Sequence, residues 1–340
     1  MLTKLQMKLT DFDYHLPDEL IAQTPIEPRD SSRLMVLGEG ISHRHFFDIT
    51  DYFEKGDTLV LNQSKVVPAK LTGNKSTGGR VEALVVSKNG AGYECLVQGK
   101  HIREGTKLHF GELEAEVLEV RKNTGTGKYL LDFKCSGNLE DILEKIGEAP
   151  LPPYIKEKLD DKNRYQTVYS KEKGSIAAPT AGLHFTEKLL GRIRDKGVNI
   201  AYVTLHVGIG TFMPVKTDEI EQHIMEPEFY SITEENAKRI NETQGKTIVC
   251  GTTTVKALES SCVDWKIMPA QTSSTLFIHP PYKFKSGIDA IITNFHLPKS
   301  TLLMLISAFA GKERIAAAYN EAIANSYRFY SFGDAMLIFR

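Results

Sequence analysis

Apolar runs of strand length alternate with helical patterns through the second half of the chain. The run VNIAYVTLHV, residues 198–207, is apolar at most positions, which is typical of a strand buried on both faces. It follows a helical pattern in which Thr186 is a plausible N-cap and Gly197 a stop signal. The same alternation continues to the C-terminus, with apolar runs at residues 247–250 and 289–293. This pattern predicts an α/β domain with a largely parallel or mixed sheet.

A different pattern occupies residues 65–133, where short segments rich in β-forming residues are separated by turn clusters such as SKNGAG. Five or six strands at this spacing favour a small antiparallel barrel, because closure removes exposed edges. A helix is expected at residues 138–147. We therefore predict that residues 65–150 form an inserted β-barrel domain within one discontinuous α/β catalytic domain, residues 1–64 and 151–340.

Composition limits the possible classes of protein. The 340 residues carry a net charge of −1 and are 41% hydrophobic and 25% charged, as in an ordinary globular protein. The longest apolar run, residues 301–310, is shorter than the roughly 20 residues that cross a bilayer, and the first residues lack a signal-peptide pattern. A cytoplasmic protein without a membrane span is expected. The four cysteines have no zinc-site spacing, and the net charge does not point to nucleic acid, although local basic surfaces remain possible.

Ligands of open α/β sheets bind at the carboxyl ends of strands, and three predicted strands end in polar residues. In TLHVGIGTF, TIVCGTTTVKALES and IITNFHLPKS these are His206, Thr211, Thr252, Thr253, Thr254, Asn294, His296 and Ser300. Backbone N–H groups at a helix start can hold an anion there. Alone, however, GTTT is also a simple helix cap. The segment VGIGTF lacks the third glycine of a dinucleotide-binding loop, so a Rossmann site is not expected.

His184 lies in SIAAPTAGLHF, a segment of mostly small and apolar residues. Its neighbours Leu183 and Phe185 predict a desolvated imidazole with a pKa below the usual value of about 6.5, neutral and able to accept or donate a proton. The alternative is a core histidine bonded to a backbone carbonyl. The segment alone does not separate these two interpretations.

The segment HIMEPE contributes His223, Glu226 and Glu228, which could bind a metal or transfer protons. It lacks the H-E-x-x-H spacing of a zinc site. Acid–base or substrate contact is therefore expected here rather than metal binding.

Eight segments, in order along nearly the whole chain, resemble one enzyme family. They are DFDYHLPDELIAQTPIEPRDSSRLMVL, LVLNQSKVVPAKLTG, APLPPYI, YQTVYSKEKGSIAAPTAGLHFT, VTLHVGIGTFMPV, GTTTVKALES, TNFHLPKSTLLMLISAFAG and YRFYSFGDAMLI. Together they resemble the S-adenosylmethionine:tRNA ribosyltransferase-isomerases of queuosine biosynthesis. The resemblance implies an α/β domain with a distorted, barrel-like mixed sheet, interrupted by a small β-barrel, and an active site where the two meet.

The resemblance implies that the ribosyl part of S-adenosylmethionine is transferred to 7-aminomethyl-7-deazaguanine at the tRNA wobble position and isomerised. Epoxyqueuosine-tRNA, adenine and methionine are the implied products, and no metal or redox cofactor is expected. A monomer is expected, although no sequence feature argues for it. Two alternatives remain: an S-adenosylmethionine-dependent RNA methyltransferase, against which the missing glycine-rich loop counts, and a tRNA-binding protein without catalytic activity.

This chemistry requires a base beside the sulfonium, assistance to adenine loss, and polar contacts to the ribose and the methionine end. The resemblance does not assign these roles, so residue type provides the candidates. For proton transfer they are His184, His206 and His296, with Glu228 as a further base. For substrate binding they are Thr180, Thr211, Thr252, Thr253, Thr254, Lys256, Asn294 and Asp334, and for tRNA binding Arg29, Arg33, Lys65 and Lys70.

With this chemistry in view, an active-site role of His184 is favoured. The small residues Ala181 and Gly182 would let a nucleoside approach the backbone, and Pro179 stiffens the loop.

The chain also departs from the family pattern. Lys65, Lys70 and Lys256 stand where arginine is usual, which keeps the charge but loses the bidentate fork. Glu226 stands where a histidine is common, which argues against a proton-transfer role at that position.

Overall fold

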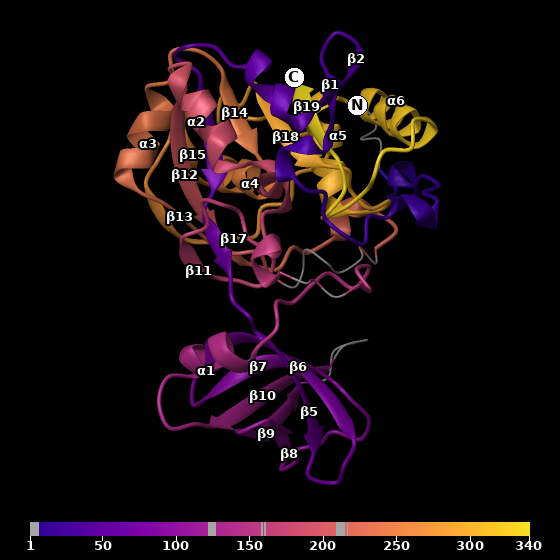
Figure 1. Ribbon diagram of the computed structural model, residues 1–340, viewed down its shortest axis with the longest axis vertical. Coiled ribbons are helices and arrows are strands. Elements are labelled where there is room, and N and C mark those ends of the chain that lie inside the picture. The colour runs from indigo at the N-terminus through magenta and orange to yellow at the C-terminus, as the bar shows by residue number, and fades with distance from the viewer. Residues whose placement is uncertain (1–6, 122–126, 158, 160, 209–214, 216) are drawn as a thin grey trace, which may run out of the picture. The chain divides into compact units, whose positions relative to one another are not determined.

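The structure, a computed structural model, describes residues 7–121, 127–157, 159, 161–208, 215 and 217–340. It divides into two compact units, one of Met1–Lys65 with Pro152–Arg340 and the other of Val66–Leu151 (Figure 1). Each unit has its own buried apolar core.

The larger unit is built on a nine-stranded mixed sheet in the order β17-β13-β12-β3-β14-β18-β19-β1-β2. Its strands are β1 (Arg33–Leu37), β2 (Ile41–His45), β3 (Thr58–Asn62), β12 (Asn199–Leu205), β13 (Glu228–Ile232), β14 (Thr247–Cys250), β17 (Ala270–Ser274), β18 (Ala290–Asn294) and β19 (Ala335–Phe339). The neighbours β12, β3, β14 and β18 run parallel, and so do β1 and β19. The other pairs are antiparallel, so the predicted mixed-sheet α/β fold is confirmed.

Helices connect these strands. The α-helices are α2 (Glu187–Asp195), α3 (Glu234–Asn241), α4 (Thr252–Ser261), α5 (Thr301–Ala310) and α6 (Lys312–Ala324). The 3₁₀-helices are η1 (Leu9–Phe12), η2 (Asp18–Leu20), η3 (Arg29–Ser31), η4 (Phe46–Tyr52), η5 (Lys162–Tyr165), η6 (Thr180–His184) and η8 (Ile220–Gln222). Two short pairs complete the unit, β4 (Ser64–Val66) with β11 (Glu172–Ser175) and β15 (Cys262–Val263) with β16 (Lys266–Ile267). In the described ranges, none of the helices has the length and apolar character needed to span a membrane.

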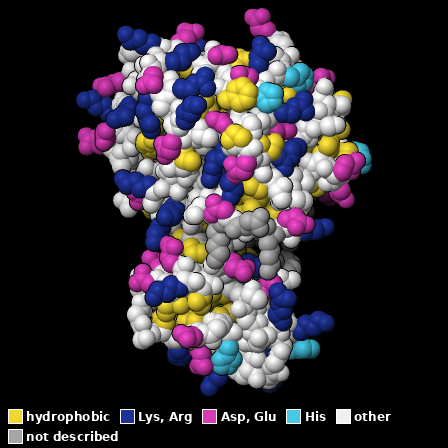
Figure 2. Space-filling view, viewed as in Figure 1, with side chains coloured by type: hydrophobic (Ala, Val, Ile, Leu, Met, Phe, Trp, Pro, Cys, Tyr) yellow, Lys and Arg dark blue, Asp and Glu magenta, His cyan; other side chains and the backbone are white. Residues whose placement is uncertain are grey.

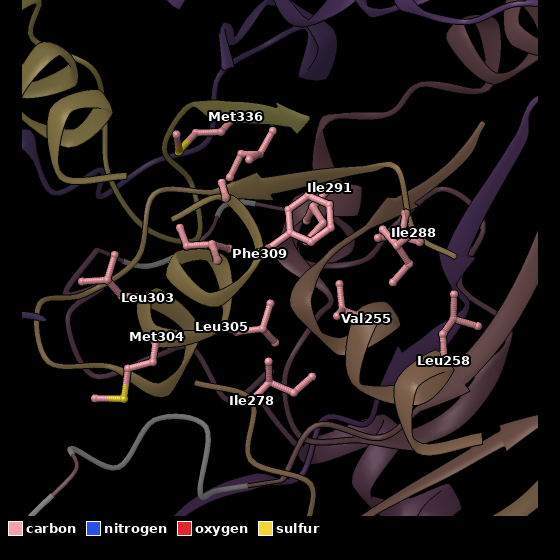
Figure 3. Packing of buried hydrophobic residues seen from close by; sticks show 14 of the residues in the cluster. Val255, Leu258, Ile278, Ile288, Ile291, Leu303, Met304, Leu305, Phe309 and Met336 are labelled. Atoms are coloured by element: carbon pink, nitrogen blue, oxygen red, sulfur yellow. The ribbon is translucent and has the colours of Figure 1, made fainter. Parts of the chain in front are cut away.

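Alternate residues of the central strands enter two separate cores. In β3, Leu59 and Leu61 join the core formed with α2 and η4, whereas Val60 joins the core formed with α3, α4, α5 and α6. Figure 3 shows part of the second core, in which Val255 of α4 and Leu305 of α5 are buried. Both faces of the sheet are therefore covered, which explains why its central strands are buried at every position and mostly apolar.

The smaller unit is a closed antiparallel barrel in the order β10-β7-β6-β5-β8-β9. Its elements are β5 (Lys70–Lys75), β6 (Arg80–Asn89), β7 (Gly92–Gln98), β8 (Lys107–Phe110), β9 (Leu113–Arg121), β10 (Gly127–Lys134) and α1 (Leu139–Ile146). Alternate side chains point into the barrel, as in β6, where Val81, Ala83 and Val85 are buried. The helix α1 adds Leu139 and Leu143 to the same core. The predicted antiparallel barrel is confirmed.

A carboxylate of α4 holds the irregular segment between β17 and β18. Glu259 is buried and accepts hydrogen bonds from the Tyr282 hydroxyl (3.0 Å) and from the backbone N–H groups of Lys285 (3.1 Å) and Ser286 (3.0 Å). The Ser286 hydroxyl donates to the same carboxylate. All these donors belong to one short stretch, so Glu259 fixes the chain that runs from an edge strand to a central strand.

Glu259→Gln is expected to lower the free energy of unfolding by about 2–3 kcal/mol, because the amide NH₂ would face donors and leave buried N–H groups unpaired. Urea unfolding measures this change. Glu235→Gln, whose side chain is 78% exposed on α3, is the matched control and should cost less than about 0.5 kcal/mol. Equal losses in the two variants would contradict the tethering role.

Candidate active site

A pocket lies at the carboxyl ends of β14 and β18, within the larger unit. After β14, Gly251 adopts a φ of +90°, a conformation open to glycine, and turns the chain into α4. After β18 the chain continues into His296, and η6 contacts this strand from the side. The polar lining consists of Thr180, Thr252, Thr253, Thr293, Asn294, His296 and Ser331. The aromatic lining consists of Tyr154, Phe295 and Tyr330.

His184 belongs to a chain of hydrogen bonds that reaches this pocket. Its Nδ1 lies 2.7 Å from Ser32 Oγ, and its Nε2 lies 3.1 Å from Asn294 Nδ2. The Thr180 hydroxyl donates to Asn294 Oδ1 at 2.9 Å. Because the Asn294 amide donates to Nε2, the proton of the neutral imidazole lies on Nδ1 and is donated to Ser32. Both ring nitrogens of His184 are thus occupied, and Asn294 and Thr180 line the pocket in its place.

The surroundings of His184 keep its imidazole neutral. The residue is 5% exposed, and its ring stacks on Phe46 with the centroids 4.9 Å apart. Burial, and after it the positive charges of Arg164, Arg29 and Arg328, lower its pKa to about 3. A proton on this ring is therefore unfavourable throughout the physiological pH range.

The small residues beside His184 have different partners. Ala181 lines the pocket, whereas Gly182 does not. A Cβ at Gly182 would lie 2.0 Å from the Tyr169 hydroxyl. The missing side chain is therefore required by packing against Tyr169, and the expectation that Gly182 makes room for a nucleoside is corrected.

His296 lines the pocket and leaves one ring nitrogen unbonded. It is 8% exposed, and burial lowers its pKa to about 3. Its Nε2 lies 2.8 Å from the Thr293 hydroxyl, while its backbone N–H donates to the Tyr319 hydroxyl and its carbonyl accepts from the Tyr14 hydroxyl. Within the described part of the chain, Nδ1 has no hydrogen-bond partner. This nitrogen is available to a bound molecule.

The three threonines that begin α4 have different surroundings. Thr252 and Thr253 line the pocket, and the Thr253 hydroxyl accepts a hydrogen bond from Asn62 Nδ2 at 3.2 Å. The Thr254 hydroxyl instead donates to the Cys250 carbonyl at 2.5 Å and is fully buried. Thr252 and Thr253 can therefore contact a ligand, whereas Thr254 closes the first turn of the helix.

A second pocket adjoins the first and shares Thr252 and Thr253 with it. Two of its lining residues form a buried ion pair, in which Lys256 Nζ lies 2.9 Å from Glu228 Oε2 and each side chain is 7% exposed. Glu228 Oε1 accepts a hydrogen bond from the backbone N–H of Gly208 at 3.0 Å. The predicted site residues Glu228 and Lys256 are thus brought together, one helical turn from the threonines.

His206 lies outside the lining of both pockets. Its ring stacks on Phe229 with the centroids 5.5 Å apart, and burial lowers its pKa. Its Nδ1 is buried without a hydrogen-bond partner among the residues described. Thr211, which the sequence places near it, lies outside the described residues.

Three other predicted site residues make contacts within the fold and line neither pocket. The Arg29 guanidinium donates to three backbone carbonyls at 2.9 to 3.3 Å. The Arg33 guanidinium lies over the Tyr327 ring, 3.7 Å from its centroid. Asp334 is 1% exposed and accepts from the backbone N–H groups of Arg33 (2.9 Å) and Arg328 (2.8 Å). Through these contacts the three side chains stabilise the packing of segments that are distant in sequence.

The remaining candidates for tRNA binding lie in different units. Lys65 is part of β4 in the larger unit, and Lys70 is part of β5 in the barrel, where its Nζ lies 3.0 Å from Glu82 Oε2. On the face shown in Figure 2, basic and acidic side chains are interspersed. No concentrated basic surface is visible on that face.

Sequence reasoning missed several residues of this region. Tyr154 and Tyr330 line the pocket with ring centroids 4.8 Å apart, and the Tyr154 hydroxyl lies 2.6 Å from Ser331 Oγ. Tyr330 has a φ of +72°, which aromatic residues rarely adopt. Ser32, the partner of His184, lies 152 positions away in the chain. The sequence feature that could have identified these residues is their position in the segments that resemble the enzyme family.

No group of three or more His, Cys, Asp or Glu in the described ranges could hold a metal ion. His223 of the HIMEPE segment lies instead against the ring of Phe277, with the centroids 5.3 Å apart. Glu228 of the same segment pairs with Lys256.

Three comparisons with known proteins agree with one another. The model of the family described as "Queuosine biosynthesis protein" matches residues 9–338. The S-adenosylmethionine:tRNA ribosyltransferase-isomerase of Acetivibrio thermocellus is 53% identical over 344 residues, covering 98% of this chain and 100% of that protein. The crystal structure of S-adenosylmethionine tRNA ribosyltransferase from Thermotoga maritima is 39% identical, with a TM-score of 0.54, and the match covers 96% of this chain and 99% of that one. Both relatives are similar to this chain over nearly their whole lengths.

Stability is expected to fall as the pH is lowered from about 6.5 to about 3, because the unfolded chain takes up a proton on His184 that the fold excludes. One such histidine contributes a slope of about 1.4 kcal/mol per pH unit. His184→Gln should remove this slope from the free energy of unfolding, measured in urea between about pH 6 and pH 4. An unchanged slope in His184→Gln would mean that the folded protein also binds this proton.

Proposed function

Because the chain belongs to the queuosine biosynthesis protein family, we propose that it is a tRNA-modifying transferase and isomerase. It moves the ribosyl moiety of S-adenosylmethionine onto 7-aminomethyl-7-deazaguanine at the tRNA wobble position and rearranges it. The products are epoxyqueuosine-tRNA, adenine and methionine. S-adenosylmethionine is therefore a substrate, and no other cofactor is part of the proposal.

The first pocket has the lining that a nucleoside needs. The rings of Tyr154 and Tyr330 provide aromatic surface for adenine. The hydroxyls of Thr252 and Thr253 and the amide of Asn294 belong to the same pocket and suit ribose hydroxyl groups. This combination of aromatic and hydrogen-bonding groups at the ends of β14 and β18 is the observation that carries the proposal.

His296 is the proposed proton-transfer group. Its Nδ1 is free of partners in the described chain, and the residue lines the pocket. Its lowered pKa keeps the imidazole neutral, so a cationic substrate is not repelled. A neutral imidazole at this place can take a proton from the carbon beside the sulfonium or assist the departure of adenine.

His184 is the proposed positioning residue. Its two ring nitrogens connect Ser32 to Asn294, and Asn294 in turn accepts from Thr180. This chain fixes the Asn294 amide in one orientation before a ligand binds, which lowers the cost of ordering the site.

The proposed partner is a tRNA that already carries the aminomethyl base. Because the proposed substrate is a tRNA, the proposed location of the reaction is the cytoplasm. The proposed active form of the protein is a monomer.

The activity is tested by incubating the protein with S-adenosylmethionine and a tRNA that carries 7-aminomethyl-7-deazaguanine. Free adenine, free methionine and a tRNA of higher mass are expected, as measured by mass spectrometry. A methyltransferase would instead release S-adenosylhomocysteine, and a non-catalytic protein would bind the tRNA without any product. Either of these results would overturn the proposed function.

His296→Gln is expected to lower the turnover number by about 10²–10⁴-fold, which is the usual effect of losing a general acid or base. The affinity for S-adenosylmethionine should change little, because the amide keeps a polar group at the pocket wall. Single-turnover adenine release and equilibrium binding measure the two effects. The exposed His45→Gln is the control and should keep full activity. Full activity in His296→Gln would exclude the assigned role.

A further inference from the structure

We propose that the second pocket binds the amino-acid end of S-adenosylmethionine, with Lys256 on the α-carboxylate. The proposal rests on the proposed function, since it divides that substrate between two adjoining pockets. The nucleoside lies in the first pocket, and the sulfonium lies near the threonines at the start of α4.

The two pockets are joined at the first turns of α4 and α5. Thr252, Thr253 and Leu302 belong to the lining of both. A molecule with a nucleoside at one end and an amino acid at the other can therefore extend from one pocket into the next. S-adenosylmethionine has this form, with the sulfonium between its two ends.

Lys256 provides donors that the fold does not use. Its Nζ donates to Glu228 Oε2 at 2.9 Å, and the residue is 6% exposed. An ammonium group has three N–H donors, and no other partner of this one occurs in the described chain. Because Lys256 lines the pocket, its remaining donors are open to an anionic group there.

The ion pair matches a zwitterion better than it matches a simple anion. Glu228 already balances the charge of Lys256, so adding a lone anion would leave the buried site with excess negative charge. An α-amino acid brings a carboxylate for Lys256 together with an ammonium that is attracted to Glu228. The net charge of the pocket then stays unchanged when the ligand binds.

Apart from the ion pair and three threonines, the pocket is apolar. Its walls include Met225, Leu276, Phe277, Ile278 and Leu305, of which Ile278 and Leu305 are labelled in Figure 3. The methylene groups of the methionine chain fit such walls well. A tRNA phosphate would lose its hydration against them without recovering it. The lining therefore favours the methionine chain over RNA.

The carboxylate contact is tested with two probes, S-adenosylmethionine and its decarboxylated analogue, in equilibrium binding to the full-length protein. The wild type should bind the analogue about 10–100-fold more weakly, because the analogue lacks only the partner of Lys256. In Lys256→Met the two probes should bind within about threefold of each other, through loss of affinity for S-adenosylmethionine alone. Lys256→Arg keeps the charge and should restore most of the discrimination.

Two further variants control for folding and for general charge effects. Lys256→Met removes the positive charge beside the buried Glu228 carboxylate. Glu228→Gln/Lys256→Met, which removes both charges, keeps the test valid if the single variant unfolds. Lys238→Met on the exposed face of α3 should behave as the wild type.

The outcomes separate the two proposals. If the wild type does not bind S-adenosylmethionine, the proposed function fails. If it binds both probes equally, or if the double variant still discriminates between them, the function stands and the assignment of the second pocket is overturned.

Discussion

Burial of both faces of the central strands determines where polar groups can lie in this unit. Successive residues of β3, β14 and β18 enter opposite apolar cores, so an unpaired polar side chain within a strand would be costly. Asn62 and Asn294 occupy the last positions of β3 and β18, where the cores end and polar partners become available. The polar groups of the candidate site therefore gather at one edge of the sheet, beside the start of α4.

The groups at this edge are largely satisfied by one another. Asn62 holds the Thr253 hydroxyl, and Asn294 is held between Thr180 and His184. A buried network of this kind has one low-energy arrangement, because any rotation would leave a donor or acceptor unpaired. Few groups are then left for a ligand to satisfy. In the described chain these include Nδ1 of His296 and the remaining donors of Lys256.

Hydrophobic periodicity was sufficient to predict the mixed sheet and the antiparallel barrel, because each reflects which side chains are buried. The strand-end rule also located Thr252, Thr253, Asn294 and His296, which line the first pocket. It could not separate Thr254 from its neighbours, since that depends on the side-chain direction within one helical turn. Contacts between residues that are distant in sequence could not be predicted either. The bond from Ser32 to His184 and the contacts of Arg29, Arg33 and Asp334 arise only when remote segments pack together.

The charges of the two pockets complement a substrate that is cationic at its centre and zwitterionic at one end. Burial lowers the pKa of His296 to about 3, so its imidazole brings no charge to the first pocket. If the ring were protonated, a sulfonium about 4 Å away would be repelled by about 4 kcal/mol at an effective dielectric constant near 20. That repulsion would weaken binding by nearly a thousandfold. The neutral ring avoids this cost and keeps a lone pair for proton transfer. In the second pocket Glu228 offsets Lys256, so the proposed zwitterionic group would bind there without adding net charge. In the proposed binding mode, the same burial thus directs the sulfonium to the neutral pocket and the carboxylate to the pocket that contains the lysine.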